Sequence, residues 1–478
     1  IDEFERQGVI RLDGQPSIWR VSHLNLHYKL CETYPSVLVV PNTISDDNLT
    51  SIAAYRSKGR LPCLTYRHVN GASLLRSAQP MTGVRQKRSR DDEQYLSEAG
   101  ITVVFDARGK AAALGNTMMG KGTENMSNYP GIELLFCDVD NIHAVRKSLE
   151  KVVDLLYCED QGDASFYSKL DDTKWLRHIR QILLASIKVV HQLHEECTTC
   201  LVHCSDGWDR TAQMCACAQI MVDPYFRTIR GFATLVEKDF LSFGHMLARR
   251  TGQLDANFSD SQRSPIFLQF LDCVWQIKRQ YPCSFEFNDE FLEALMDAVY
   301  SCRFGTFLYN SDRERRACEK ITDSESFWSY TLRRLPKFKN VNYIRRSEVL
   351  EPRPQMYNLN LWPYLFRFQR AFLERESTVP WSEARVQKIN TLSQELKTLK
   401  ERLRLLEGED MAQEKPPPRS SAVSPIREES DELESDDDSS DDDDVAEPLR
   451  LSVMSLGSDF YVPPPPLPPT QYMAREPS

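Results

Sequence analysis

The sequence lacks the features that usually identify membrane-spanning and secreted proteins. Its apolar runs stay well short of the roughly 18 residues that a spanning helix needs, so we expect none. The first residues, IDEFERQGVI, contain neither an initiator Met nor a signal-peptide pattern. We interpret this as an internal start and expect an upstream domain to precede it.

Basic charge is not in surplus. The chain has 59 Lys and Arg residues against 69 Asp and Glu residues, a formal net charge of −10, and the acidic excess lies after residue 410. The part before residue 410 is close to neutral, whereas a dedicated nucleic-acid binder usually has a basic surplus. We therefore expect no nucleic-acid partner.

The 13 cysteines are an odd number spread over a long chain, unlike a secreted disulfide framework. This cysteine usage predicts a reducing, cytoplasmic location, where a conspicuous cysteine more often takes part in a reaction than in a structural disulfide. Cys197 and Cys200 form a CTTC sequence, but no second ligand pair follows at zinc-finger spacing. We expect no metal and no cofactor. Cys200 is interpreted as a buried strand residue, or alternatively as a reversible disulfide partner of Cys204.

Short apolar runs with β character alternate with helical patterns, which is typical of an α/β fold. The expected strands are 36–40, 101–105, 132–136 and 200–203, and the clearest helices are 175–194, 210–222 and 267–280. Nearly all aromatic residues lie before residue 375. We predict one enlarged domain over residues 1–375, with a central sheet flanked by helices.

Two further segments follow this domain. Within 382–407, apolar residues step by three and four, as in the a/d seam of a coiled coil: Ile389, Leu392, Leu396, Leu399, Leu403 and Leu406. The pattern predicts a dimer, with a single helix packed on the domain as the alternative. Residues 408–478 contain a self-repelling acidic block and PPPPLPP, and are predicted to be a disordered tail. The proline run favours either a ligand for a polyproline-binding module or a bare spacer.

The sharpest signal is VHCSDGWDRT at 202–211. Five residues separate Cys204 from Arg210, after a β-like run and before a helical pattern, so the segment predicts a loop wrapped around an oxyanion. Arg210 would grip two phosphate oxygens, and the same positive field would lower the pKa of Cys204. The product would be a cysteinyl-phosphate that water hydrolyses, with Thr211 hydrogen-bonded to the departing thiolate.

The spacing alone does not carry this interpretation. Cys273 and Arg279 have the same separation, but their segment has no Gly and continues a helical pattern, so we predict a core helix there. The loop at Cys204 differs because a strand precedes it, Gly207 lies within it and a helix follows.

The segment HCSDGWDRT closely resembles the signature of active myotubularin-related phosphoinositide 3-phosphatases. The resemblance extends over residues 1 to about 375 through AYRSKGR, GKGTEN, DNIHAVR and FGHMLARR. It is greatest to the subgroup of shorter members without a zinc-finger lipid module. It implies a cysteine-dependent phosphatase fold and removal of the 3-phosphate from phosphatidylinositol 3-phosphate and the 3,5-bisphosphate. It further implies a peripheral position on endosomal membranes and a homodimer or a heterodimer with a related inactive subunit.

The resemblance also assigns roles to residues. Cys204 would be the nucleophile, and the 3-phosphate would lie in a cradle formed by Ser205, Asp206, Gly207, Trp208, Asp209 and Arg210. Asn116, Asn141, Ile142 and Arg250 match substrate-contacting positions. Met246 stands where the family pattern usually has Lys or Arg, which implies weaker recognition of a second phosphate.

The leaving inositol oxygen needs a proton, and the chain contains no WPD tripeptide of the kind that tyrosine phosphatases often use. Two acids lie in the loop itself. We favour Asp209 as the general acid, with Asp206 positioning water or substrate. The alternative is that either carboxylate only bonds loop N–H groups or pairs with Arg210. His203 either hydrogen-bonds within the base of the loop or is a satisfied core histidine, and His143 has the same two interpretations.

Two other functions remain open. A protein tyrosine phosphatase would use the same nucleophile, but the Asp-rich loop and the missing WPD element weigh against it. A catalytically silent adaptor acting through the coiled coil is expected to have lost Cys204 or Arg210, and both are present.

Overall fold

The computed structural model describes residues 1–10, 17–157, 163–253, 259–318 and 324–366, together with Gln394, Thr398, Leu399 and Arg402. The chain divides into two units, Ile1–Arg385 and Val386–Ser478. All elements described below belong to the first unit. In the second unit, the four described residues are helical.

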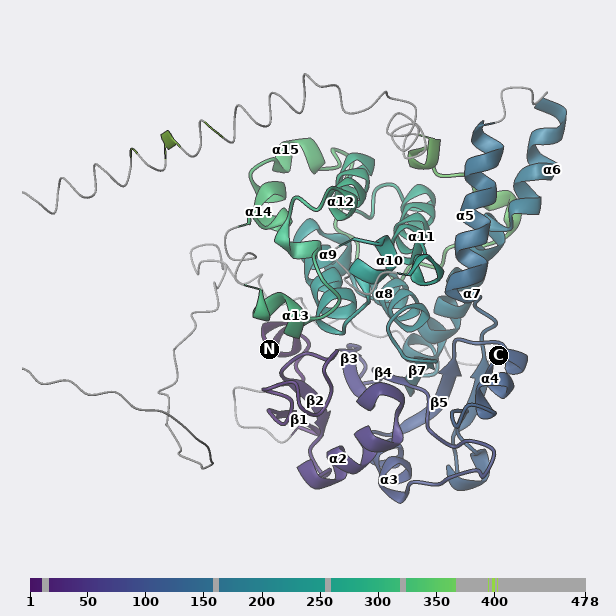
Figure 1. Cartoon of the computed structure of the whole chain (residues 1–478), viewed down its shortest axis with the longest axis vertical. Helices are drawn as coiled ribbons and strands as arrows, with labels where there is room; N and C mark the ends of the chain where they lie inside the picture. Colours follow the sequence, from purple (N-terminus) through teal and green to yellow (C-terminus); the bar gives the residue numbers. More distant parts are fainter. Residues whose placement is uncertain are drawn as a thin grey trace, which may run out of the picture. The chain divides into compact units, whose positions relative to one another are not determined.

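The first unit is built on a mixed five-stranded sheet (Figure 1). Its strands run in the order β3-β4-β7-β5-β6, with β3 antiparallel to β4 and the other neighbours parallel. Their bounds are Cys63–Arg67 (β3), Ser73–Ala78 (β4), Ile101–Asp106 (β5), Glu133–Phe136 (β6) and Thr199–Cys204 (β7). Strands β1 (Trp19–Ser22) and β2 (Leu38–Pro41) form a separate antiparallel pair.

Helices occupy both sides of the central sheet. Those between β2 and β7 are α2 (Asp46–Tyr55), α3 (Arg90–Glu98), α4 (Lys110–Thr117), α5 (Ile142–Tyr157), α6 (Asp163–Thr173) and α7 (Trp175–His194). After β7 come α8 (Arg210–Val222), α9 (Ile229–Val236), α10 (Leu247–Thr251), α11 (Ile266–Gln280), α12 (Asp289–Ser301), α13 (Asp312–Ala317), α14 (Phe327–Leu332) and α15 (Leu335–Phe338). The short helix α1 (Asp2–Arg6) begins the chain. Among the described residues, no helix is both long and apolar enough to cross a membrane.

Strand β7 separates two hydrophobic cores because successive strand side chains point to opposite faces. Cys200, Val202 and Cys204 join the larger core, to which α7, α8 and α11 contribute. Leu201 joins the smaller core, with residues of β1, β2, α2 and α3. The strand is therefore covered on both faces, and its last residue, Cys204, is 2% exposed.

Helix α8 follows this strand after a five-residue loop. All of its residues after Arg210 are buried, so the helix runs through the core. Asp209 occupies the N-cap position with non-helical backbone angles, but its side chain caps no helical N–H group. The N-terminal N–H groups of a buried helix thus point at the loop that begins with Cys204.

The mixed α/β architecture, with helices flanking a central sheet, confirms the predicted fold class in that coarse form. The four expected strands are present with bounds shifted by at most two residues, and 175–194 and 210–222 match α7 and α8. Cys273 and Arg279 lie within α11, as expected for a core helix. The predicted domain end at residue 375 and the tail over 408–478 lie outside the described residues. So does the coiled coil over 382–407, apart from the four helical residues noted above.

A buried network of charges joins α2 and α3 to the segment that follows α4. The Arg56 guanidinium donates to both Asp92 carboxylate oxygens at 2.7 Å and to Glu124 at 2.6 Å, and all three side chains are fully buried. Glu124 also lies 3.1 Å from His203 Nε2 on β7. These pairs compensate charges that would otherwise be very unfavourable in the interior.

We therefore expect Arg56→Met to lower the free energy of unfolding by about 3–5 kcal/mol, because it leaves two buried carboxylates without their partner. Arg20→Met is the matched control, since Arg20 pairs with a half-exposed Asp46. Its cost is expected to be about 1 kcal/mol or less. Urea unfolding of both variants measures the difference, and equal losses would contradict a structural role for the buried network.

Candidate active site

The Cys204 thiol lies at the base of the loop that joins β7 to α8. Its sulfur accepts a hydrogen bond from the Gly207 amide at 3.3 Å. Burial on its own would raise the pKa of this thiol. The positive charge of Arg210, together with the nearby hydroxyl and amide of Thr211, outweighs burial and lowers the pKa of the thiol below its ordinary value of 9.0. The Thr211 hydroxyl is buried and makes no hydrogen bond to another described residue, so it remains available near the sulfur.

Gly207 sets the shape of the loop. Its φ angle is +75°, and a Cβ at this position would lie 2.3 Å from the Ser77 carbonyl oxygen on β4. Only glycine combines this backbone conformation with so close an approach to a neighbouring strand. The loop is therefore packed directly against the sheet.

Two buried arginines hold the Gly207 carbonyl. Arg60 donates to this oxygen at 3.0 Å and Arg76 at 2.8 Å. The carbonyl is thereby directed at the arginines, while the Gly207 amide is directed at the sulfur. Sequence analysis did not identify either arginine as a site residue. Arg76 interrupts an otherwise apolar strand, SLLRSA, and this was the available signal.

Arg210 begins α8 beside the loop. It donates to the Val139 carbonyl at 3.2 Å and to the Ser205 hydroxyl at 3.3 Å. Among the described residues it makes no ion pair with a carboxylate, so its charge is free to act on the thiol and on a bound anion. Val139 lies just before Asn141 and Ile142, which places their segment next to the site.

Asp209 is paired, but with Arg250 rather than with Arg210. Its carboxylate oxygens accept from Arg250 Nε at 3.0 Å and Nη2 at 2.7 Å, and the first oxygen lies 3.2 Å from His245 Nδ1. Burial opposes ionisation here, yet the Arg250 charge and the His245 hydrogen bond hold the pKa of the Asp209 carboxyl well below its usual range. In this arrangement Asp209 is ionised. His245 Nδ1 also bonds the Trp208 carbonyl at 2.9 Å.

Asp206, the other acid of the loop, lies in a different environment. It accepts a hydrogen bond from the Ser57 hydroxyl at 2.8 Å and lies 3.7 Å from the Lys121 ammonium. Its side chain is 21% exposed. The two loop acids therefore face different partners, Arg250 on one side and Ser57 with Lys121 on the other.

Two of the remaining predicted substrate residues lie at the start of α5, and the third lies on α4. The Asn141 side chain caps α5 by accepting from the His143 and Ala144 amides at 3.0 and 3.1 Å. Ile142 begins α5. Asn116 lies on α4, and its carbonyl accepts from the Lys121 amide at 3.2 Å. No hydrogen bond between the described residues joins the Asn116 side chain to the loop.

Met246 immediately precedes α10 and is 6% exposed, and its carbonyl accepts from the Arg250 amide at 2.8 Å. The two residues are therefore neighbours across one turn of chain. Arg250 itself is 4% exposed and also donates to the Gln262 carbonyl at 2.9 Å.

His203 belongs to the structural network. Burial would lower the pKa of its imidazole, but the Glu124 carboxylate raises it above the usual range. The interpretation as a satisfied core histidine fits this geometry. Cys200 is a free, buried thiol in this structure, and burial raises its pKa well above 9.0. Within the described ranges, no group of three or more His, Cys, Asp or Glu residues is arranged to hold a metal ion.

Comparison with known proteins identifies the family. A model of the myotubularin-like phosphatase domain matches residues 1–316. The chain is 42% identical over 370 residues to myotubularin of Xenopus tropicalis, covering 75% of this chain and 60% of that protein. It is 43% identical over 378 residues to phosphatidylinositol-3,5-bisphosphate 3-phosphatase MTMR2 of Gallus gallus, covering 75% and 64% respectively. The chain belongs to the myotubularin-like phosphatase domain family, and it spans about three fifths of the length of these relatives.

The Cys204 environment makes a prediction that needs no substrate. Alkylation of Cys204 by iodoacetamide, followed by mass spectrometry against pH, should show a midpoint below 9.0 because the thiolate is stabilised. Arg210→Met should shift this midpoint upward, since it removes the largest stabilising charge. The exposed Cys197 serves as an internal reference in the same digest. A midpoint that does not respond to Arg210→Met would contradict the proposed source of the thiolate.

Proposed function

We propose that this protein is a phosphoinositide 3-phosphatase that hydrolyses phosphatidylinositol 3-phosphate through a cysteinyl-phosphate intermediate. One observation carries the proposal. The Cys204 thiol has a lowered pKa and lies at the base of a loop, where the Gly207 amide donates to the sulfur and Arg210 has no carboxylate partner among the described residues. This arrangement suits binding and attack of a phosphate group. Family membership supports the phosphatase reaction. The name of the MTMR2 relative, a phosphatidylinositol-3,5-bisphosphate 3-phosphatase, supports a phosphoinositide with a 3-phosphate as substrate.

The reaction proceeds in two steps. The Cys204 thiolate attacks the phosphorus, the bond between phosphorus and the inositol oxygen breaks, and that oxygen takes a proton as the dephosphorylated lipid leaves. Water then attacks the cysteinyl-phosphate, which releases inorganic phosphate and restores the thiolate. Arg210 and the loop N–H groups stabilise the charge on the phosphoryl oxygens in both steps, and Thr211 stabilises the departing thiolate.

We assign the proton for the inositol oxygen to Asp209, which must first be released from Arg250. While Arg250 and His245 contact the carboxylate, it is ionised and has no proton to give. A phosphate in the loop is a competing anion for Arg250. When Arg250 turns to it, the pKa of Asp209 rises and the carboxyl can take up and donate a proton.

The most direct functional test compares substrates. Short-chain phosphatidylinositol 3-phosphate, the 3,5-bisphosphate and a panel of phosphotyrosine peptides are assayed for phosphate release with the full chain. The proposal expects turnover of the lipids and little turnover of the peptides. Preferred hydrolysis of peptides would support a tyrosine phosphatase, and absence of all turnover would support an adaptor.

Asp209→Asn should lower kcat on the inositol lipid by about a hundredfold or more, as expected for loss of a general acid. The loss should be much smaller on an aryl phosphate whose leaving group is a weak base and needs no proton. Asp206→Asn, measured on the same two substrates, is the matched control. Equal losses of Asp209→Asn on both substrates would show that Asp209 only shapes the loop.

Met246 bears on the choice between the two lipids. The family resemblance places a cation at position 246 beside Arg250, where the two would face a second phosphate. Because Met246 carries no charge, Arg250 is left as the cation there, and we propose a preference for the monophosphate. Met246→Arg adds a charge-assisted contact, for which roughly 1.5–3 kcal/mol is typical. The kcat/KM ratio of bisphosphate to monophosphate should therefore rise about tenfold, whereas Met246→Leu should leave it unchanged. If the kcat/KM ratio is the same in Met246→Arg as in the parent enzyme, position 246 does not contact the second phosphate.

We further propose that the protein acts on the cytoplasmic side of endosomal membranes and pairs through residues 382–407, with itself or with a related inactive subunit. The heptad pattern supports the pairing. A chain ended at Val379 should sediment as a monomer and still hydrolyse soluble substrate. If the shortened chain remained a dimer, the interface would lie in the phosphatase domain.

A further inference from the structure

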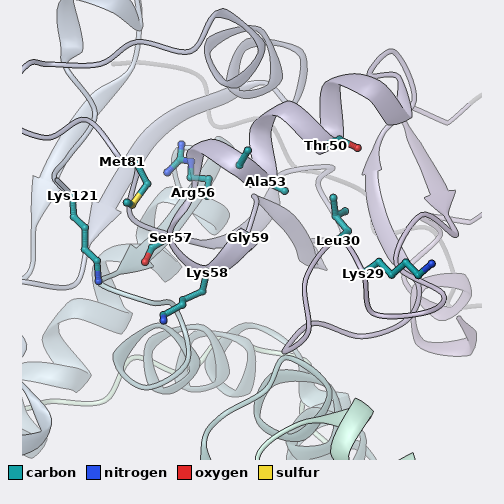
Figure 2. A pocket seen from close by; sticks show the side chains of 11 residues that line it. Lys29, Leu30, Thr50, Ala53, Arg56, Ser57, Lys58, Gly59, Met81 and Lys121 are labelled. Carbon is teal, nitrogen blue, oxygen red and sulfur yellow. The ribbon is translucent and has the colours of Figure 1, made fainter. Parts of the chain in front are cut away.

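A groove of about 530 Å³ lies beside the catalytic loop and has no role in the reaction described above (Figure 2). The end of α2, the turn Ser57–Gly59, Met81 and Lys121 line it, and it extends to Lys29 and Leu30. Figure 2 shows Lys58 and Lys121 at the same end as Ser57, with Lys29 at the opposite end.

The charges in this groove are unevenly compensated. Lys58 is exposed and makes no ion pair with any described carboxylate. Lys121 has one acidic neighbour, Asp206, at 3.7 Å. Arg56 also borders the groove, but its guanidinium is already bound to Asp92 and Glu124 in the interior. The end near Ser57 therefore has two ammonium groups against one carboxylate, that of Asp206, which leaves a net positive charge.

The backbone fixes Lys58 at this place. Its φ angle is +59°, which is uncommon for a residue with a side chain, and the next residue, Gly59, has φ +69°. A Cβ on Gly59 would lie 2.8 Å from the Leu30 carbonyl oxygen, so the turn is packed tightly against that segment. The Cys31 thiol donates to the Lys58 carbonyl at 3.5 Å. A lysine is thus retained in a conformation that disfavours it, at the edge of an active site.

The groove adjoins the loop through Asp206. The Asp206 carboxylate accepts from Ser57 at 2.8 Å and lies 3.7 Å from the Lys121 ammonium. This end of the groove therefore already contacts one anionic group of the protein. Asp206 is two residues from Cys204, so this end of the groove lies next to the catalytic loop. Asp209, the other acid of the loop, pairs with Arg250 instead.

Ring chemistry indicates which phosphate belongs here. Carbons 1 and 5 of inositol both lie two bonds from carbon 3, on opposite flanks of the ring. If a 5-phosphate lies on the flank of Arg250, the phosphodiester on carbon 1 lies on the other. That phosphodiester is present in every phosphatidylinositol and carries one negative charge.

We propose that Lys58 and Lys121 form a second phosphate-binding site, which holds the phosphodiester of the lipid whose 3-phosphate lies on Cys204. The inference rests on the proposed function and extends it, because it explains how the site would distinguish an inositol lipid from a small phosphate ester. The two ammonium groups supply the donors, since the Ser57 hydroxyl already donates to Asp206.

The test uses two soluble ligands that differ only at carbon 1. Glycerophosphoinositol 3-phosphate carries the phosphodiester, and inositol 3-phosphate does not. Calorimetric titration into the full chain carrying Cys204→Ser measures binding without turnover. Lys58→Asn removes the charge with a residue that tolerates the left-handed backbone. It should weaken binding of the first ligand about fivefold, as for a partly exposed ion pair, and leave the second unchanged.

Lys58→Arg keeps the charge and should bind both ligands as the parent does. Lys29→Asn, at the far end of the groove, should have no effect on either. If Lys58→Asn weakened the binding of both ligands equally, Lys58 would have a structural role only. If it weakened the binding of neither, the prediction for the soluble ligands would be wrong. In that last case, binding to phosphatidylserine vesicles is compared between the parent and Lys58→Asn. Weaker vesicle binding by Lys58→Asn would mean that Lys58 contacts the phosphate of a neighbouring lipid. Unchanged vesicle binding would overturn the second phosphate-binding site altogether.

These outcomes separate the second site from the proposed function. If the parent enzyme hydrolyses phosphatidylinositol 3-phosphate and Lys58→Asn changes neither binding nor vesicle association, the second site is wrong and the function stands. If the parent hydrolyses no lipid but Lys58→Asn still weakens the first ligand selectively, the reaction is wrong and the site stands.

Discussion

The shape of the catalytic loop depends on the Gly207 carbonyl and the two buried arginines that hold it. Arg60 and Arg76 converge on this one oxygen from different elements. Arg76 also pairs with Asp239, whereas Arg60 bonds only uncharged oxygens, those of Thr33, Phe243 and Gly207. With the carbonyl held in this way, the Gly207 amide remains directed at the sulfur. The geometry needed for an anion is thus built into the fold before any substrate arrives.

A second constraint is the distribution of compensated charge. Arg56, Arg108 and His203 all lie near the site, and each is bound to a buried carboxylate. Their charges stabilise the fold, and each is opposed by the carboxylate that it contacts. Arg210 has no such partner among the described residues, and it is the largest favourable influence on the thiolate. Arg210 therefore differs from these three residues, because no carboxylate among the described residues opposes its charge, which remains available to the thiolate and to a bound anion.

Much of this site was predictable from the sequence, for identifiable reasons. A β-like run, a loop with one Gly and a helical pattern predicted that Cys204 and Arg210 lie between a strand and a helix, and β7 and α8 confirm this arrangement. Strand and helix periodicities are local properties, so they can be read from the sequence. The turn between β3 and β4 also had a local signal, Asn70-Gly71, but those strands were not predicted. Contacts between distant segments had no such signal. The pairing of Asp209 with Arg250 crosses 41 residues, and the contact of Arg60 with Gly207 crosses 147.

The central claim is that Cys204 carries the phosphoryl group between lipid and water. It is tested most directly by mixing the enzyme with short-chain phosphatidylinositol 3-phosphate, quenching in denaturant within one turnover, and mapping phosphate by mass spectrometry. The account predicts a transient phosphate on the peptide that contains Cys204, which decays as inorganic phosphate appears. Full turnover with no phosphate on that cysteine at any quench time would contradict it.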